Sequence, residues 1–301
     1  MLGIGEIIRI NRIEKGYSQE ALCFGICAVS SLSKIENGSQ IPTRGTFEAL
    51  MERLGLPPGI YPSFLNDRDK NAYELQHDFN ELYANGNFDK AKLILNELKE
   101  ISDLDKVYKE FVMLSEVLIK QQEGLPPIDA IREFEEIIDM FFQDFTPQKI
   151  RRLLLTKTEI NLLNAYAAAH YMAGNADTAK EILYEIITYI DSKVYDREGI
   201  TIVYTQILSS LSNYVGLAGK DEEAIRLCDI GIKLCIRYNR FTHFSHLLFN
   251  KGYGLINLGK KEEGAKFIQE SYYIDRAMGE RYAKEMEITR KFAKKHGIEL
   301  L

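Results

Sequence analysis

Two histidines are the strongest candidates for metal ligands in this chain. His243 and His246 stand three residues apart, which places both imidazoles on one face of a helix. No third ligand follows at a suitable spacing, so the sequence predicts no metal site. It also contains no nucleophile–base pair, phosphate loop or cofactor fingerprint. We therefore expect no enzyme and no cofactor.

The four cysteines form two pairs, Cys23 with Cys27 and Cys228 with Cys235. Each pair has helical spacing inside an apolar pattern, and neither forms a Cys-x-x-Cys motif. We expect reduced core thiols, with a redox or metal role as the alternative.

Composition favours a helical protein of the cytoplasm. The 301 residues include seven prolines and no tryptophan, and 46% are hydrophobic. No apolar run is long enough to span a membrane, and the amphipathic start does not resemble a signal peptide. The net charge is −6, yet residues 1–60 carry six basic and six acidic residues. A neutral N-terminal segment that bound DNA would depend on dimerisation for affinity.

Apolar periodicity predicts four or five short helices in residues 1–66. A first helix spans residues 2–15, with Ile4, Ile7, Ile8 and Ile10 inward. Ser18 caps a second helix over residues 19–25, which buries Ala21, Leu22 and either Phe24 or Cys23. A third helix runs over 29–36, with Leu32 and Ile35 inward. A fourth helix begins at Pro42-Thr43 and runs to Leu54, with an apolar face formed by Phe47, Leu50, Met51 and Leu54. The proline-rich segment 55–70 predicts a linker or a fifth short helix and the domain boundary. This pattern matches a lambda-repressor-like helix-turn-helix domain.

The segments "YSQEAL" and "SSLSKIENGSQIP" resemble the Xre-type helix-turn-helix signature. The turn "FGICAV" is one residue shorter than usual, as in PlcR-type regulators. The resemblance implies a third helix in the major groove, where Ser and Lys side chains can contact base edges. The residues that it places at DNA are Ser18, Gln19, Val29, Ser30, Ser31, Lys34, Asn37 and Arg44. The alternative is that the serines only cap or solvate a helix and Lys34 is a surface charge.

A short phrase recurs through residues 67–301: "GNFDKA", "GNADTA", "GKDEEA" and "GKKEEG", with "LPPIDA" as a degenerate copy. The glycine permits the positive φ of a turn between antiparallel helices, and the small residue five positions later allows close packing. About five helix pairs must stack to bury their apolar faces. The sequence thus predicts a tetratricopeptide-like α-solenoid, ended by a charged helix over residues 281–295.

Solenoids of this type expose a concave surface, whose positions lie about thirteen, ten, six and three residues before each turn glycine. Asparagine is a poor helix former, and its amide both donates and accepts, which suits the backbone of an extended peptide. Aromatic side chains would supply pockets. The alternative is that these amides cap turns or bridge helices, above all Asn250. The predicted peptide-binding residues are Tyr73, Gln76, Asn80, Asn161, Asn164, Tyr171, Gln206, Asn213, His246, Phe249, Asn250 and Tyr253.

The two parts together, 1–66 and 67–301, resemble the peptide-sensing regulators of Gram-positive bacteria typified by Rgg, PlcR and PrgX. The resemblance implies a homodimer that binds a double-stranded operator and takes a short signalling peptide on its repeats. Two alternatives remain open. One is a protein-binding scaffold without an operator, and the other is a regulator that senses a small molecule or nothing.

Overall fold

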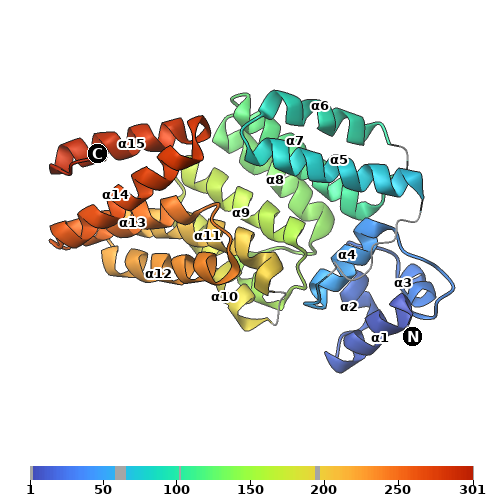
Figure 1. Cartoon of the computed structure of the whole chain (residues 1–301). Coiled ribbons are helices and arrows are strands. Elements are labelled where there is room, and N and C mark those ends of the chain that lie inside the picture. The colour runs from blue at the N-terminus through green and yellow to red at the C-terminus, as the bar shows by residue number, and fades with distance from the viewer. Residues whose placement is uncertain (1–2, 58–65, 102, 194–196, 301) are drawn as a thin grey trace. The chain divides into compact units, whose positions relative to one another are not determined.

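The computed structural model describes residues 3–57, 66–101, 103–193 and 197–300. Within these ranges every regular element is an α-helix or a short 3-10 helix (Figure 1), as the all-α prediction requires. The chain divides into two compact units. The first holds Met1–Asn175 and Asp191–Asp196, and the second holds Ala176–Ile190 and Arg197–Leu301. None of the described helices is both long enough and apolar enough to span a membrane.

The first unit begins with four short helices, α1 (Ile4–Glu14), α2 (Gln19–Cys23), α3 (Val29–Glu36) and α4 (Arg44–Arg53), which we call the head. Ser18 and Thr43 cap α2 and α4 by accepting a backbone N–H with their hydroxyl oxygens. Gly5 lets α1 lie directly on α3, because a Cβ at this position would stand 1.8 Å from the carbonyl oxygen of Ile35. The close approach of the two backbones therefore determines how α1 packs on α3.

The head has a continuous apolar core, and the sequence predicted most of it. Ile10 was predicted inward and is 38% exposed. It stands two residues after the buried Ile8, about 200° further around the helix. The second helix ends at Cys23, not at residue 25, because Phe24 leaves the helical conformation at ψ 128°. Ala21 is exposed, against the prediction, and of the two candidates Cys23 is buried while Phe24 is not. The buried apolar residues are Ile8, Leu22, Cys23, Ile26, Leu32, Ile35, Phe47, Ala49, Leu50, Met51 and Leu54.

Helices of the repeats follow in antiparallel pairs. The first unit contains α5 (Asp67–Ala84) with α6 (Phe88–Lys99), α7 (Lys106–Gln122) with α8 (Pro127–Phe141), the 3-10 helix η2 (Pro147–Arg152) and α9 (Lys157–Met172). Next comes α10 (Ala176–Ser192). The second unit continues with α11 (Arg197–Leu217) and α12 (Asp221–Tyr238), α13 (Phe244–Asn257) and α14 (Lys261–Met278), the 3-10 helix η3 (Glu280–Tyr282) and the charged terminal helix α15 (Ala283–His296).

The recurring phrase marks the turns between paired helices, as predicted. The turn glycines Gly86, Gly124, Gly174, Gly219 and Gly259 all have positive φ, between 73° and 98°. The small residues that follow, Ala91, Ala130, Ala179, Ala224 and Gly264, are all buried. At Gly264 a Cβ would stand 2.8 Å from the carbonyl oxygen of Gly252 on the partner helix. The helix-turn-helix and repeat architecture predicted from the sequence is therefore confirmed.

Residues 58–65 of the predicted linker lie outside the described residues, and α5 begins at Asp67. The first unit joins the head to α5–α9, so the boundary at residue 66 stays a prediction. All four cysteines are free thiols, and three of them are buried. Burial raises the pKa of Cys27 to about 11 and that of Cys228 to about 12, which disfavours the reactive thiolate.

Candidate nucleic-acid interface

The helix-turn-helix consists of α2, a turn and α3. Leu32 and Ile35 anchor α3 in the core of the head. Ser18 lies at the exposed start of α2, where its Oγ accepts the backbone N–H of Ala21 at 3.0 Å. Its oxygen is thus used by the cap, and no described residue accepts a hydrogen bond from its O–H. The α2 start therefore presents a hydroxyl donor at the surface.

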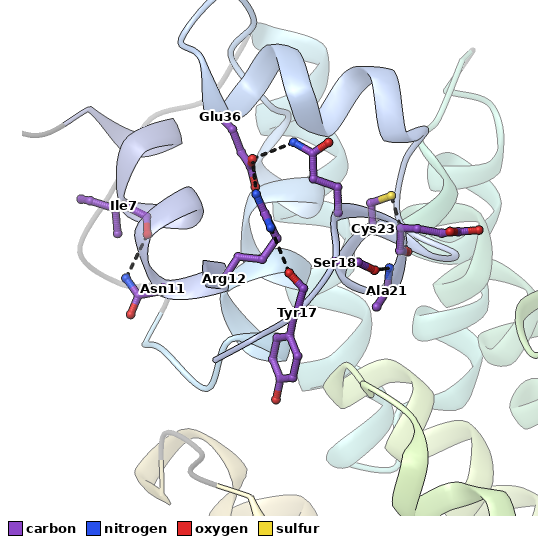
Figure 2. Close-up of polar contacts among 10 residues, drawn as sticks. Ile7, Asn11, Arg12, Tyr17, Ser18, Ala21, Cys23 and Glu36 are labelled. Carbon is purple, nitrogen blue, oxygen red and sulfur yellow. Dashed lines mark hydrogen bonds and ion pairs between the residues drawn. The ribbon is translucent and has the colours of Figure 1, made fainter. Parts of the chain in front are cut away.

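A buried carboxylate ties the end of α3 to both preceding helices (Figure 2). Glu36 accepts two bonds from the guanidinium of Arg12, at 2.6 and 2.9 Å, and one from the side-chain amide of Gln19 at 2.7 Å. A third Arg12 donor reaches the carbonyl oxygen of Tyr17 at 2.9 Å. Burial alone would raise the pKa of Glu36, but these donors hold it below the ordinary value. The orientation of α3 is therefore set by ionic hydrogen bonds, and Gln19 takes part in them.

The outward face of α3 has the predicted residues and one more. Val29, Ser30 and Lys34 are exposed, and Ser31 is half-buried. Ser33 is also exposed on this face, although it is not among the residues predicted from the sequence. Ser33 follows the inward Leu32 by one residue and precedes the inward Ile35 by two, which places it on the outward side of the helix. Helical periodicity alone could therefore have predicted that it is exposed.

The residues after α3 are ordered by a side-chain cap. Asn37 follows the helix, and its Oδ1 accepts the backbone N–H of Ser39 at 3.0 Å and the hydroxyl of Ser39 at 2.5 Å. Both residues are exposed. The side-chain amide nitrogen of Asn37 donates to no acceptor in the described part of the chain, so it can still donate to a ligand.

The cations of the head fall into two groups. Arg12, Arg44 and Arg53 are each in an ion pair, whereas Arg9, Lys15 and Lys34 are exposed and form no ion pair among the described residues. Three unpaired cations offer few phosphate contacts for one head.

Arg44 is the predicted DNA contact that is least accessible. Its Nε donates to Glu48 at 2.5 Å, and its guanidinium lies 5.4 Å from the ring centre of Tyr73. Its backbone N–H donates to both carboxylate oxygens of Asp69, at 3.0 and 2.9 Å. A phosphate contact by Arg44 would require these side-chain interactions to break.

Helix α4 is bound at both ends to the repeat helices of its unit. At its start, Asp105 accepts the hydroxyl of Thr43 at 2.5 Å and that of Thr46 at 3.1 Å. At its end, Arg53 pairs with Glu159, the third residue of α9, at 2.7 Å. The same guanidinium donates to the carbonyl oxygens of Leu22 and Phe24 at the end of α2, at 3.0 and 2.5 Å. Arg53 therefore connects the helix-turn-helix to α9.

The predicted peptide-binding residues of the first unit lie on α5 and α9. Asn80 is exposed, Tyr73, Gln76, Asn161 and Tyr171 are half-buried, and Asn164 is buried. The side-chain amide of Asn164 forms no hydrogen bond with another described residue, although buried amides are normally bonded. An unbonded amide on a helix face is what a site for a polar ligand requires.

The predicted residues of the second unit lie on α11 and α13. Asn213 is exposed and Gln206 is half-buried. Asn250 donates to the carbonyl oxygen of Ser209 at 3.0 Å and to the hydroxyl of Ser212 at 2.9 Å. It bridges α13 to α11, which is the helix-bridging role that the sequence analysis left open.

The aromatic residues of α13 pack on the terminal helix. The rings of Phe249 and Tyr253 lie 5.4 and 5.5 Å from that of Phe292 on α15. The Nε2 atom of His246 lies 3.9 Å from the Oε1 atom of Glu285 on α15. Burial lowers the pKa of the neighbouring His243 to about 4. Within the described chain no group of three or more ligating side chains could hold a metal ion.

Comparison with known proteins supports this assignment of elements. Residues 8–60 match the helix-turn-helix family model. Comparison with curated protein sequences gives no match. Among solved structures, the chain is similar to apo PlcR of Bacillus thuringiensis (TM-score 0.61, 14% identity, 96% of this chain and 98% of that chain). It is also similar to PlcR bound to the peptide PapR7 and DNA (0.57, 16%, 96% and 97%) and to ComR of S. thermophilus bound to DNA and its signalling peptide ComS (0.58, 14%, 98% and 100%). At these identities the likeness establishes the fold, and the predicted resemblance to this group of regulator folds is confirmed.

Proposed function

We propose that this chain is a non-enzymatic transcription regulator of the cytoplasm, which binds a DNA operator as a homodimer and responds to a short peptide. The observation that carries the proposal is a helix-turn-helix at residues 8–60 inside a fold shared along almost the whole chain with PlcR and ComR. Structures of both those proteins contain DNA and a signalling peptide.

The outward face of α3 is the proposed DNA-reading surface. Serine hydroxyls donate or accept at base edges, and Lys34 can reach a guanine or a phosphate. Ser30 and Ser33 extend this polar face along the helix. With three unpaired cations per head, useful affinity requires two heads on half-sites about one helical turn apart or more.

Replacement of Ser31 and Lys34 together by alanine tests the surface. Operator binding should weaken by about 2–5 kcal/mol per dimer, with helix content and thermal unfolding unchanged. A mobility-shift assay at stated salt against the promoter beside its own gene measures this, and Lys90→Ala on α6 is the control. Unchanged operator affinity in the double variant would reject α3 as the reading helix. No operator binding by the parent chain would favour a protein-binding scaffold.

The repeat helices supply the proposed peptide site. The unbonded amides of Asn164 and Asn213 can pair with a peptide backbone, and each alanine variant should lose about 1–3 kcal/mol of peptide affinity. Melting should barely change, since alanine is the better helix former. Calorimetry with synthetic peptides encoded beside the gene measures the affinity. A fall in melting temperature with peptide affinity intact would assign both residues to structure.

Helix α9 offers a physical route from peptide to DNA. It carries Asn161 and Asn164, and its first turn carries Glu159, which is paired with Arg53. Arg53 in turn holds the carbonyl groups at the end of α2. A small displacement of α9 on peptide binding would therefore act on the helix-turn-helix through one ion pair.

A further inference from the structure

A cavity of about 330 Å³ lies within the first unit, on the outer side of α2. We call it the α2 cavity. Its apolar wall is formed by Ala21 and Phe24 of the head, by Phe141 and Phe142 at the end of α8, and by Leu153 and Leu154 after η2. This volume falls at the lower end of the range for small-molecule sites.

The apolar wall includes a partly exposed aromatic ring. Phe24 is 46% exposed, and burial of this exposed apolar surface by a ligand would be favourable. Phe141 and Phe142, which line the same cavity, are buried, so the cavity offers three aromatic rings to an apolar ligand. An apolar ligand body would bury the ring of Phe24 without a polar group being desolvated.

The polar lining offers mainly hydrogen-bond donors. At the floor, Arg53 and Glu159 neutralise each other, and the buried Nε of Arg53 has no acceptor in the described structure. Arg152, the last residue of η2, is exposed and forms no ion pair with a described residue. The hydroxyl of Ser18 adds a donor, and Glu20, which is exposed to water, adds the only unpaired carboxylate.

We propose that the α2 cavity binds a small monocarboxylate with an apolar body, whose carboxylate pairs with Arg152 and whose body packs on Phe24, Phe142 and Leu154. A guanidinium binds a carboxylate through two parallel hydrogen bonds, which a neutral or cationic group cannot form. The carboxylate belongs either to a free organic acid or to the C-terminal residue of a peptide.

The site would connect a metabolite to the head. Its ligand would contact Ser18 and Ala21 at the start of α2 together with the chain between α8 and α9. If the proposed DNA function holds, occupancy would change operator affinity, because α2 and α3 are joined through Gln19 and Glu36. Ligand binding itself does not depend on that function, so the two can fail separately.

Calorimetry on the full chain tests the proposal with 3-phenylpropionate, its primary amide and 3-phenylpropylamine as probes. The acid should bind saturably and at least about tenfold more tightly than the amide or the amine. Arg152→Gln should weaken binding of the acid by about tenfold or more. Arg151 is the neighbouring exposed arginine and does not line the cavity, so Arg151→Gln should leave that binding unchanged. Acetyl-Ala-Ala-Phe distinguishes the sources. Binding as tight as that of the free acid indicates a peptide terminus, and weaker binding a free acid.

A second variant fills the space. Leu154→Trp should abolish binding, with the circular dichroism melting curve as the check on folding, and Arg152→Gln carries the test alone if that variant does not fold. The proposal is overturned if no saturable heat appears up to about 10 mM acid, if the amine binds as tightly as the acid, or if Arg152→Gln binds like the parent chain.

Discussion

Removal of Glu159 should destabilise the first unit far more than removal of any surface charge. The side chains of Arg53 and Glu159 are 3% and 2% exposed, and the atoms that join them lie 2.7 Å apart. In Glu159→Ala the guanidinium stays buried, because its other donors still hold the carbonyl groups of Leu22 and Phe24. The variant therefore leaves a buried charge without its counter-ion.

The size of the effect follows from that charge. Breaking a buried pair by deleting one partner costs about 3–5 kcal/mol, a large share of the 5–15 kcal/mol that holds an ordinary domain folded. Each kcal/mol corresponds to about 2–4 °C for a chain of 150–250 residues, so melting should fall by about 6–20 °C. Arg53→Met combined with Glu159→Leu removes both charges and should cost less than Glu159→Ala alone.

Two further variants separate the charge from the helix cap. Glu159 also accepts the backbone N–H of Thr156 at 2.6 Å in the capping box of α9. Glu159→Gln keeps an acceptor for that N–H and removes only the charge. Glu74→Ala, which breaks an exposed pair with Lys70, should cost less than about 1 kcal/mol. Urea unfolding measures all of them. A cost below about 1 kcal/mol for Glu159→Ala would refute a buried pair between the head and α9.

Three further predictions concern packing, protonation and an inter-helix bond. Gly5→Ala should cost about 1–3 kcal/mol in urea unfolding, because α1 must move off Ile35, whereas Gly3→Ala, with open space around it, should cost almost nothing. Equal costs would contradict the close approach. Burial, with the nearby charge of Glu159, raises the pKa of Glu110. The folded state therefore favours the protonated carboxyl, and the stability that this adds is complete below the ordinary glutamate pKa of about 4.3. It is lost as the pH rises through the raised pKa of the folded state. Glu110→Gln should flatten the profile of unfolding free energy against pH over that window, and an unaltered profile would show that Glu110 ionises without cost. Asn250→Ala should lower the unfolding free energy by about 1–3 kcal/mol through its two lost bonds to α11, and unchanged melting would leave this amide free for a ligand.

Local signals in the sequence predicted most of the fold. The bounds of α3, the cap at Ser18 and the turn glycines all depend on residues a few positions apart. Helical periodicity decided which side chains face inward, and it failed where it was not applied strictly, as at Ile10 and Ser33.

The residues that join the head to the repeats could not be predicted in this way. Arg53 and Glu159 are 106 residues apart, and Thr43 and Asp105 are 62 apart. In the sequence each reads as an ordinary charge or hydroxyl on a helix. The sequence favoured a structural role for Asn250 over the other asparagines but could not name its partners, which only the position of α11 beside α13 supplies.

The binding of α4 by Asp69, Asp105 and Glu159 has a consequence for chimaeras and for recombination in evolution. A helix-turn-helix exchanged at the linker would leave these three carboxylates behind and would bring its own fourth helix onto them. Such a graft should succeed only if the incoming helix offers an arginine and two hydroxyls at matching positions. The helix-turn-helix of this protein is therefore not an independently exchangeable unit, since it depends on carboxylates supplied by α5, by the N-cap of α7 and by α9.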